Sequence, residues 1–339
     1  MMETGNAGPC TRLSARQKYG GLSLGSLCLI EEDEYGLYAK MITKYFMAEG
    51  LLHGNYVFCA SANENPWEML NSLPTPNEGL AQDSTKPTEN KEELKIAWRY
   101  ENLSVDGNVG KLGGTSFDLS TPMELTKEQK LRIIAWEGLN ITSSKELRGS
   151  IQNLWCISLI ETVAAAIKQW NLTSGSNSNF LRLVISSCGS SHWQFEENQT
   201  CDLPLTMILL KSLLRSANAV AVVTVPHHLQ RPVALARCRS ISDVVLRLKS
   251  LREDSHLQDL MDVHGILEIK KVVNLHSLKS ILGHSGTTTY GFKATKRKFK
   301  IEKLHLPPSL ESDQQSSALE PQEQSIGCSS GASKSKLDF

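Results

Sequence analysis

The sequence has no excess of charge of either sign. Its 339 residues include 36 lysines and arginines against 36 aspartates and glutamates, so the formal net charge is zero. The summed charge therefore provides no general attraction to nucleic acid. A nucleic-acid partner would have to be bound by a local patch of basic side chains.

Cysteine pairs at metal-binding spacing are also missing. None of the eight cysteines forms a C-x-x-C pair, and no group of histidines and cysteines has the spacing of a zinc site. Cys28, Cys59 and Cys188 lie in or at the end of apolar runs, where cysteine behaves as a small hydrophobic residue. This usage is typical of a reducing compartment, and we expect neither a metal nor a cofactor.

Long apolar runs are absent as well. No run approaches the length that is needed to cross a membrane. The first ten residues, MMETGNAGPC, lack the charged and then apolar segments of a secretory signal peptide. We therefore expect no association with a membrane.

The sequence does contain alternating strand and helix patterns. Apolar residues recur at helical spacing in three segments, 37–50, 151–170 and 202–217. The expected strands are 27–30, 55–61, 94–100, 179–187, 219–226, 242–248, 265–272 and 298–304. This alternation predicts an α/β fold with a mainly parallel sheet covered by helices on both faces. The last three strands have no helix between them, which indicates an antiparallel extension at one edge.

Polar segments divide the chain. Residues 1–18 and 309–339 are polar and lack periodicity, so we expect a disordered N-terminus and a disordered tail. Residues 19–308 form the expected domain, which has long loops near 74–93 and 101–122.

The turn after the first strand is where a nucleotide-binding α/β domain would hold phosphate. The P-loop pattern G-x-x-x-x-G-K-[ST], placed there, falls on Glu31 to Tyr38. Gly36 matches the second glycine, but Glu31 replaces the first, Leu37 the lysine and Tyr38 the hydroxyl residue. A carboxylate about 5 Å from a phosphate charge costs roughly 3 kcal/mol at an effective dielectric of about 20. The P-loop is therefore degenerate, and the acids are better explained as charges that complement a helix N-terminus.

A second requirement of phosphate chemistry is also unmet. P-loop enzymes hold magnesium with an acidic residue at the end of a later buried strand. The best candidate strand ends in Ser186 and Ser187, and no acid follows before Glu196. Our hypothesis is a P-loop type fold without its catalytic residues.

Several stretches in fixed order resemble one family, the fourth subunit of the Elongator complex. They are GSLCLIEED (25–33), KYFMAEGLLHG (44–54), IAWRY (96–100), SISDVVLRLKS (240–250), HGILEIKKV (264–272), KRKFKIEKLHLPP (296–308) and KLDF (336–339). The resemblance implies a RecA-like fold without working Walker motifs. It also implies a hetero-hexameric ring with the fifth and sixth subunits, which binds tRNA. This ring serves a separate catalytic sub-complex that modifies wobble uridines, in the cytoplasm and the nucleus.

The chain departs from the family pattern before the first strand. The family usually carries TG-x-x-x-LD-x-x-LGGG there, whereas this chain has LSARQKYGG, in which only Gly20 and Gly21 match. Two alternatives stay open. One is an active RecA-type ATPase, and the other is a stand-alone binding protein that has lost its ring partners.

The clearest basic stretch lies near the end of the expected domain. Its alternation from Lys298 onward predicts a half-buried strand with a basic outer face. Such a face could bind the tRNA backbone, whereas the alternative is a solvated edge strand, because lysine commonly blocks edge pairing. The candidate residues are Lys296, Arg297, Lys298 and Lys300.

Arg237 and Arg239 form a second basic candidate. In an extended segment they would lie on the same side and could contact tRNA or a partner, whereas the alternative is an ordinary transition from loop to strand. The pair His227 and His228 has no third metal ligand nearby in the pattern. Cys188 and His192 lack the G-x-S-x-G context of a nucleophile elbow, so we expect no catalytic residue.

Overall fold

The structure is a computed structural model of the chain. It describes residues 22–77, 115–138, 151–173, 179–194, 202–252, 262–272 and 288–304. The two expected disordered termini and the expected strand 94–100 lie outside these residues. None of the helices in the described ranges is both long and apolar enough to cross a membrane.

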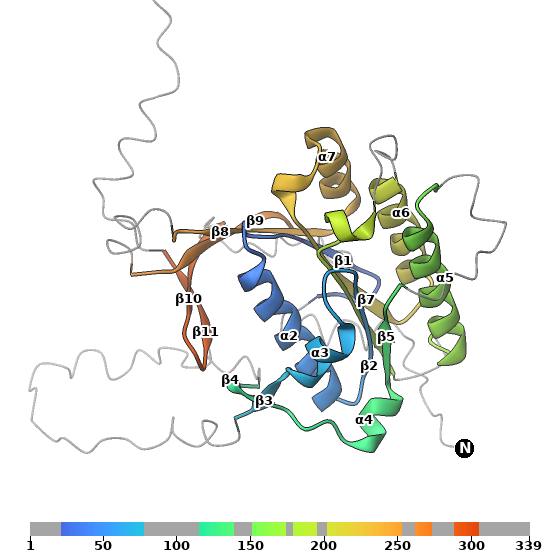
Figure 1. Cartoon of the computed structure of the whole chain (residues 1–339), viewed down its shortest axis with the longest axis horizontal. Coiled ribbons are helices and arrows are strands. Elements are labelled where there is room, and N and C mark those ends of the chain that lie inside the picture. The colour runs from blue at the N-terminus through green and yellow to red at the C-terminus, as the bar shows by residue number, and fades with distance from the viewer. Residues whose placement is uncertain are drawn as a thin grey trace, which may run out of the picture. The chain divides into compact units, whose positions relative to one another are not determined.

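One sheet forms the centre of the fold, and nine of its strands lie in the described ranges, in the order β11-β10-β9-β8-β1-β7-β6-β2-β5 (Figure 1). The six strands from β8 to β5 are parallel to one another. They are β8 (Val244–Ser250), β1 (Leu27–Glu31), β7 (Ala219–Val225), β6 (Leu181–Ser186), β2 (Tyr56–Ser61) and β5 (Ile133–Trp136). β1 and β7 are buried along their whole length, as strands covered on both faces must be.

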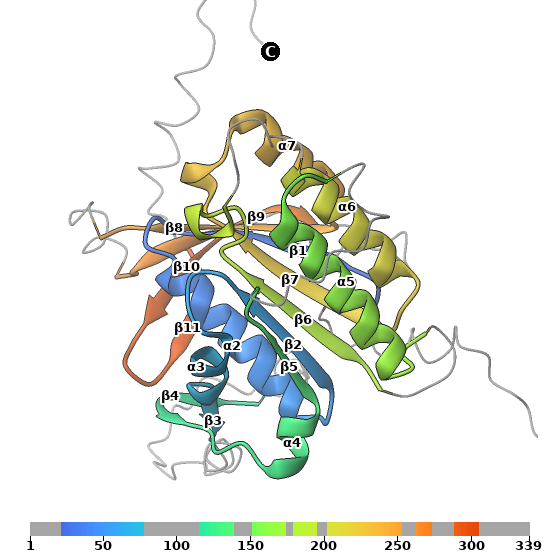
Figure 2. The same cartoon turned by 45° about the vertical axis from the view of Figure 1, so that its right-hand side comes forward.

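Helices cover both faces of the sheet (Figure 2). On one face, Leu27 and Leu29 belong to the core that α5 (Leu154–Gln169), α6 (Asp202–Arg215) and α7 (Pro232–Ile241) share. On the other face, Cys28 and Ile30 pack with α2 (Leu37–Leu52). The alternation along β1 assigns successive side chains to opposite faces. The predicted α/β arrangement is confirmed, and it is consistent with a RecA-like fold.

The antiparallel extension is confirmed at the β8 edge. β9 (Gly265–Val272), β10 (Thr289–Ala294) and β11 (Phe299–Lys303) follow β8, and each pairs antiparallel with its neighbour. β10 was not predicted, because its glycine, Gly291, interrupts the alternation of TYGFKA.

Residues 117–122 correct one sequence prediction. They belong to a segment expected to be loop, but β4 (Phe117–Pro122) pairs antiparallel with β3 (Pro74–Pro76) in a separate two-stranded sheet. Prolines in both strands obscured the pattern, because proline is normally confined to edge strands. Two short helices, α3 (Pro66–Asn71) and α4 (Lys127–Leu131), were also not predicted.

The segment 235–243 corrects a second prediction. Residues expected to be extended, or a transition from loop to strand, lie mostly in helix α7, which has Pro232 in its first turn. Proline is well suited to that position, because its missing N–H would be unpaired there in any case.

Candidate functional site

The turn from β1 to α2 lies at the carboxyl ends of the parallel strands, where α/β sheets usually bind ligands. Glu31, the last residue of β1, is completely buried. Arg239 of α7 pairs with its carboxylate, and Arg239 Nη2 donates to Glu31 Oε2 at 2.8 Å. Arg247 Nε lies 3.9 Å from the same oxygen. A buried charge without such partners would be strongly destabilising.

The next residue, Glu32, is also buried, but its partners are hydroxyl groups. Ser187 Oγ donates to Glu32 Oε1 at 2.9 Å, and Thr224 Oγ1 donates to the same atom. Burial raises the pKa of the Glu32 carboxyl above its usual value, and the two hydroxyl groups oppose that shift. The hydrogen-bond donors of this carboxylate are neutral hydroxyl groups, whereas the partners of Glu31 are arginines.

The backbone of Glu32 is linked to the neighbouring strand through a histidine. His227 Nδ1 donates to the Glu32 carbonyl oxygen at 2.8 Å, and Arg247 Nη2 lies 3.3 Å from His227 Nε2. His227 thus takes part in a contact that joins the end of β1 to β8. Within the ranges that the structure describes, no group of three or more His, Cys, Asp or Glu side chains could hold a metal ion.

Asp33 is the acid that caps helix α2. Its Oδ1 accepts a hydrogen bond from the Tyr38 backbone N–H at 3.2 Å, and its carbonyl accepts one from Gly36 at 2.9 Å. Asp33 therefore interacts with the N-terminus of a helix, as we expected of the acids in this turn. Glu31 and Glu32 have other partners.

The remaining P-loop positions offer phosphate no lysine ammonium group and no serine or threonine hydroxyl group. Gly36 has a φ of 65°, a left-handed conformation that favours glycine. Leu37 is 43% exposed at the start of α2. Tyr38 is buried, and its ring centroid lies 4.5 Å from that of Phe292 on β10. Tyr38 therefore belongs to the core that joins α2 to the antiparallel strands.

A cleft of about 380 Å³ opens beside this turn. Its lining residues come from the ends of β1, β6 and β7 and the segments after them, from the segment after β2, and from the start of α2. They are Glu32, Glu34, Tyr35, Gly36, Leu37, Lys40, Asn63, Glu64, Ser186, Ser187, Ser190, Thr224, Pro226, His228 and Leu229. The charged groups are three carboxylates and one ammonium group, that of Lys40, which pairs with Glu64. The cleft would repel a phosphate group rather than bind it.

The strand end that would supply a magnesium ligand carries hydroxyl groups instead. Ser186 and Ser187 end β6 and line the cleft. Cys188, the next residue, is buried, and burial raises the pKa of its thiol well above the usual 9.0. A buried thiol in this state is a poor nucleophile.

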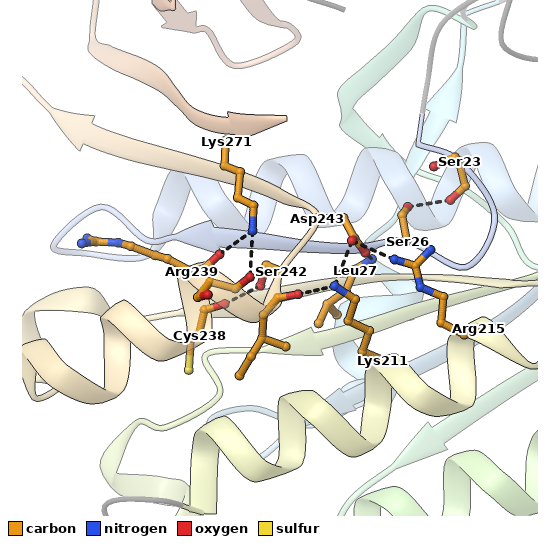
Figure 3. A network of polar contacts seen from close by, with 12 residues as sticks. Ser23, Ser26, Leu27, Lys211, Arg215, Cys238, Arg239, Ser242, Asp243 and Lys271 are labelled. Atoms are coloured by element: carbon orange, nitrogen blue, oxygen red, sulfur yellow. Dashed lines mark hydrogen bonds and ion pairs between the residues drawn. The ribbon is translucent and has the colours of Figure 1, made fainter. Parts of the chain in front are cut away.

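Helix α7 is held in place by cations at its carboxyl end (Figure 3). Lys271 Nζ donates to the carbonyl oxygens of Ser240 at 2.8 Å and Arg239 at 3.2 Å. Asp243, just beyond the helix, accepts the Leu27 backbone N–H at 3.0 Å and pairs with Arg215 at 2.9 Å. Cations near helix carboxyl ends are stabilising, so these contacts fix the helix that supplies Arg239.

The two arginine candidates do not lie side by side. Arg237 is exposed on α7, whereas Arg239 turns inward to Glu31. Residues two positions apart in a helix point in widely different directions, so the extended arrangement is wrong. Whether either side chain meets tRNA stays a prediction.

The basic stretch forms the tip of a hairpin. Lys296, Arg297 and Lys298 are exposed in the turn between β10 and β11, and Arg297 accepts a backbone hydrogen bond from Leu119 of β4 at 2.9 Å. Lys300 is exposed on β11 and pairs with Glu302.

The strand that follows this tip is an edge strand, as one of the two readings expected. The prediction that one face of this strand is half buried was wrong. Of its five residues only Phe299 is partly buried, and its ring centroid lies 5.2 Å from that of Phe292. Among the strands in the described ranges, β11 is the outermost on this side of the sheet.

Sequence reasoning missed the residues that neutralise Glu31. A glutamate at the end of an apolar strand signals that a cation must lie nearby, because an unpaired buried charge is costly. The sequence cannot say which cation, since Arg239 lies 208 positions away. Arg247 was missed for the same reason, and His227 was named without this contact to Glu32.

Comparisons with known proteins identify the family of the chain. The PAXNEB protein family model matches residues 18–339. The chain is similar to Elongator complex protein 4 of Mus musculus, at 34% identity over 94% of this chain and 82% of the mouse protein. The protein of the same name from Xenopus laevis is 34% identical over 94% of this chain and 86% of its own length. The protein of the same name from Homo sapiens is 32% identical over 86% of this chain and 74% of its own length. The family model and these relatives cover most of the chain, which therefore belongs to the PAXNEB protein family and is related to Elongator complex protein 4.

Proposed function

We propose that the chain is a non-catalytic subunit of the Elongator complex. The names of its relatives support membership of that complex. The observation that supports a non-catalytic role is the ion pair between Glu31 and Arg239, which occupies the position of the first P-loop glycine. A buried carboxylate there, beside a cleft with a formal charge of −2, disfavours nucleotide phosphate.

In this proposal the chain acts through its shape and its surface. It forms a hetero-hexameric RecA-like ring with the fifth and sixth Elongator subunits. The ring binds tRNA and presents it to the catalytic sub-complex, which modifies the wobble uridine. The exposed basic tip at Lys296, Arg297 and Lys298 supports contact with a phosphate backbone. We place this activity in the cytoplasm and the nucleus.

Reconstitution tests the proposal directly. The chain is produced together with the fifth and sixth subunits of the same organism, and the mass of the purified assembly is measured by light scattering. We expect a hexamer that binds tRNA, whereas the chain purified alone should bind tRNA more weakly. A chain that elutes without the other two subunits would contradict the ring and favour the stand-alone binding protein.

A further inference from the structure

The mouth of the acidic cleft is lined by exposed apolar side chains. Tyr35 is 58% exposed, Leu37 43% and Leu229 57%. They come from the β1–α2 turn, the first residue of α2, and the segment after β7. Large apolar side chains gathered around one depression are typical of a surface that a protein partner covers.

The floor of the same cleft is negatively charged. Glu32 is only 4% exposed, and both of its hydroxyl donors bind Oε1. The second oxygen, Oε2, lies toward Gly36, since a Cβ atom built on that glycine would be 3.4 Å from it. Glu32 and Gly36 both line the cleft, so one oxygen of this buried carboxylate faces it.

The cation of the cleft does not neutralise this floor. Lys40 is paired with Glu64, on the side of the cleft formed by the residues after β2. No ion pair joins Glu32 or Glu34 to a cation among the residues that the structure describes. The cleft thus has a negative charge of its own inside an apolar rim.

We propose that this cleft receives a lysine or arginine side chain of another subunit, carried on a segment whose neighbouring side chains are apolar. The cation would lie against Glu32 and Glu34, and the apolar neighbours would cover Tyr35, Leu37 and Leu229. Charge complementarity selects this occupant, because an anionic ligand would be repelled by the same carboxylates. The inference rests on the proposed function in one respect, that the chain assembles with other subunits.

The burial of Glu32 also favours a cation as the group that enters the cleft. Burial raises the pKa of the carboxyl, so the ionised form is destabilised in the free chain. An incoming cation would stabilise the ionised form and would remove part of that cost when the partner binds.

The first experiment measures assembly of cleft variants with the fifth and sixth subunits. Glu34→Lys and Leu229→Ser change exposed residues, so they should fold as the unchanged chain does. We expect each to weaken binding roughly tenfold or more, as charge and anchor changes at interfaces do. The matched controls on α4, Glu128→Lys and Leu131→Ser, are also exposed, and they should bind normally.

The outcomes separate the two proposals. If the unchanged chain does not bind the other subunits, the proposed function fails. If the unchanged chain binds and the cleft variants bind equally well, only the present inference is overturned.

Protection from labelling identifies the covered surface independently. Leu229→Cys is treated with a maleimide, and the modification of that residue is followed by mass spectrometry, with Leu131→Cys as the control. In the assembly we expect labelling at position 229 to slow about tenfold, with no change at position 131. Equal labelling rates at position 229 in the free and assembled chain would overturn the inference. Protection already present in the chain alone would also overturn it, because the occupant would then be a second copy.

Discussion

The guanidinium group of Arg239 and the carboxylate of Glu31 form an ion pair in which Glu31 is completely buried. Position 31 corresponds to the first glycine of the P-loop pattern, and here it carries the buried carboxylate of this ion pair. Arg247 Nε lies 3.9 Å from Glu31 Oε2 and is a second cation beside the same carboxylate. The pair joins α7 to the carboxyl end of the central strand β1, so it is a structural contact between the helix and the sheet.

Removal of Arg239 should destabilise the fold. Arg239→Ala leaves the buried Glu31 with only the more distant Arg247, and we expect a loss of about 1–3 kcal/mol in the free energy of unfolding. The value lies below that of a fully buried pair because the Arg239 side chain is 39% exposed. Denaturation in urea measures the loss.

A double-mutant cycle shows whether this loss comes from the pair. In Glu31→Gln the charge is gone, so adding Arg239→Ala should cost less than it does in the original chain. Lys130→Ala, an exposed cation on α4, serves as the control and should change stability by less than about 0.5 kcal/mol. Strict additivity of the two substitutions would show that the ion pair contributes nothing.

Replacement of Glu32 should change the dependence of stability on pH. The pKa of Glu32 in the folded chain is raised above 4.5, so the folded state holds this proton more tightly than the unfolded state. The contribution of Glu32 to stability is therefore fully present below about 4.5 and is lost as the pH rises through the folded pKa. The variant Glu32→Gln has no carboxyl group to ionise here, so it should not lose this stability as the pH rises. Its amide oxygen can still accept hydrogen bonds from the two hydroxyl donors.

The expected result is a variant that becomes more stable relative to the original chain as the pH rises, up to a plateau. Thermal unfolding at a series of pH values from 4 to 8 measures it. Glu34→Gln, at an exposed position beside it, is the control and should follow the original chain. A constant difference between Glu32→Gln and the original chain over the series would contradict the prediction.

Nucleotide should neither bind to the chain nor be hydrolysed by it. Leu37 and Tyr38 provide no cation and no metal ligand, and Glu32 and Glu34 repel phosphate. Calorimetric titration with magnesium and ATP should show no binding, and Leu37→Lys should not create it, because the carboxylates remain. ATP hydrolysis by the purified chain that disappears in Lys40→Ala would instead support the alternative of an active ATPase.

Reversal of charge at the hairpin tip should weaken tRNA binding by the assembled ring. Lys296→Glu together with Lys298→Glu removes two exposed cations, so the magnitude of the negative slope of log affinity against log salt should decrease by roughly two. Adding Arg297→Glu should decrease it further. Filter binding over a range of salt concentrations measures both effects.

The matched control for the tip reverses two exposed lysines of α4, Lys127 and Lys130. These positions should leave the affinity and its salt dependence nearly unchanged. If the tip variants behave in the same way as this control, the tip is a solvated turn beside an edge strand and not a tRNA contact.

Sequence patterns were most informative where the physical constraint is local. The apolar runs of β1, β6 and β7 and the helical spacing of α2, α5 and α6 follow from which side chains are buried, so these elements were predicted within a few residues. Elements stabilised mainly by their neighbours were missed. β4 depends on pairing with β3, and α7 depends on cations from α6 and β9 at its carboxyl end.

The sequence by itself determined that phosphate chemistry is lost, because that chemistry needs particular residue types at fixed spacing, and Leu37 and Tyr38 stand in their places. Only the tertiary structure decided what replaced it. Glu31 finds its cation 208 positions away, and the cleft is assembled from the ends of strands that are distant along the chain. A buried charge makes a partner necessary, but the order of strands in the sheet and the position of α7 decide which residue that partner is.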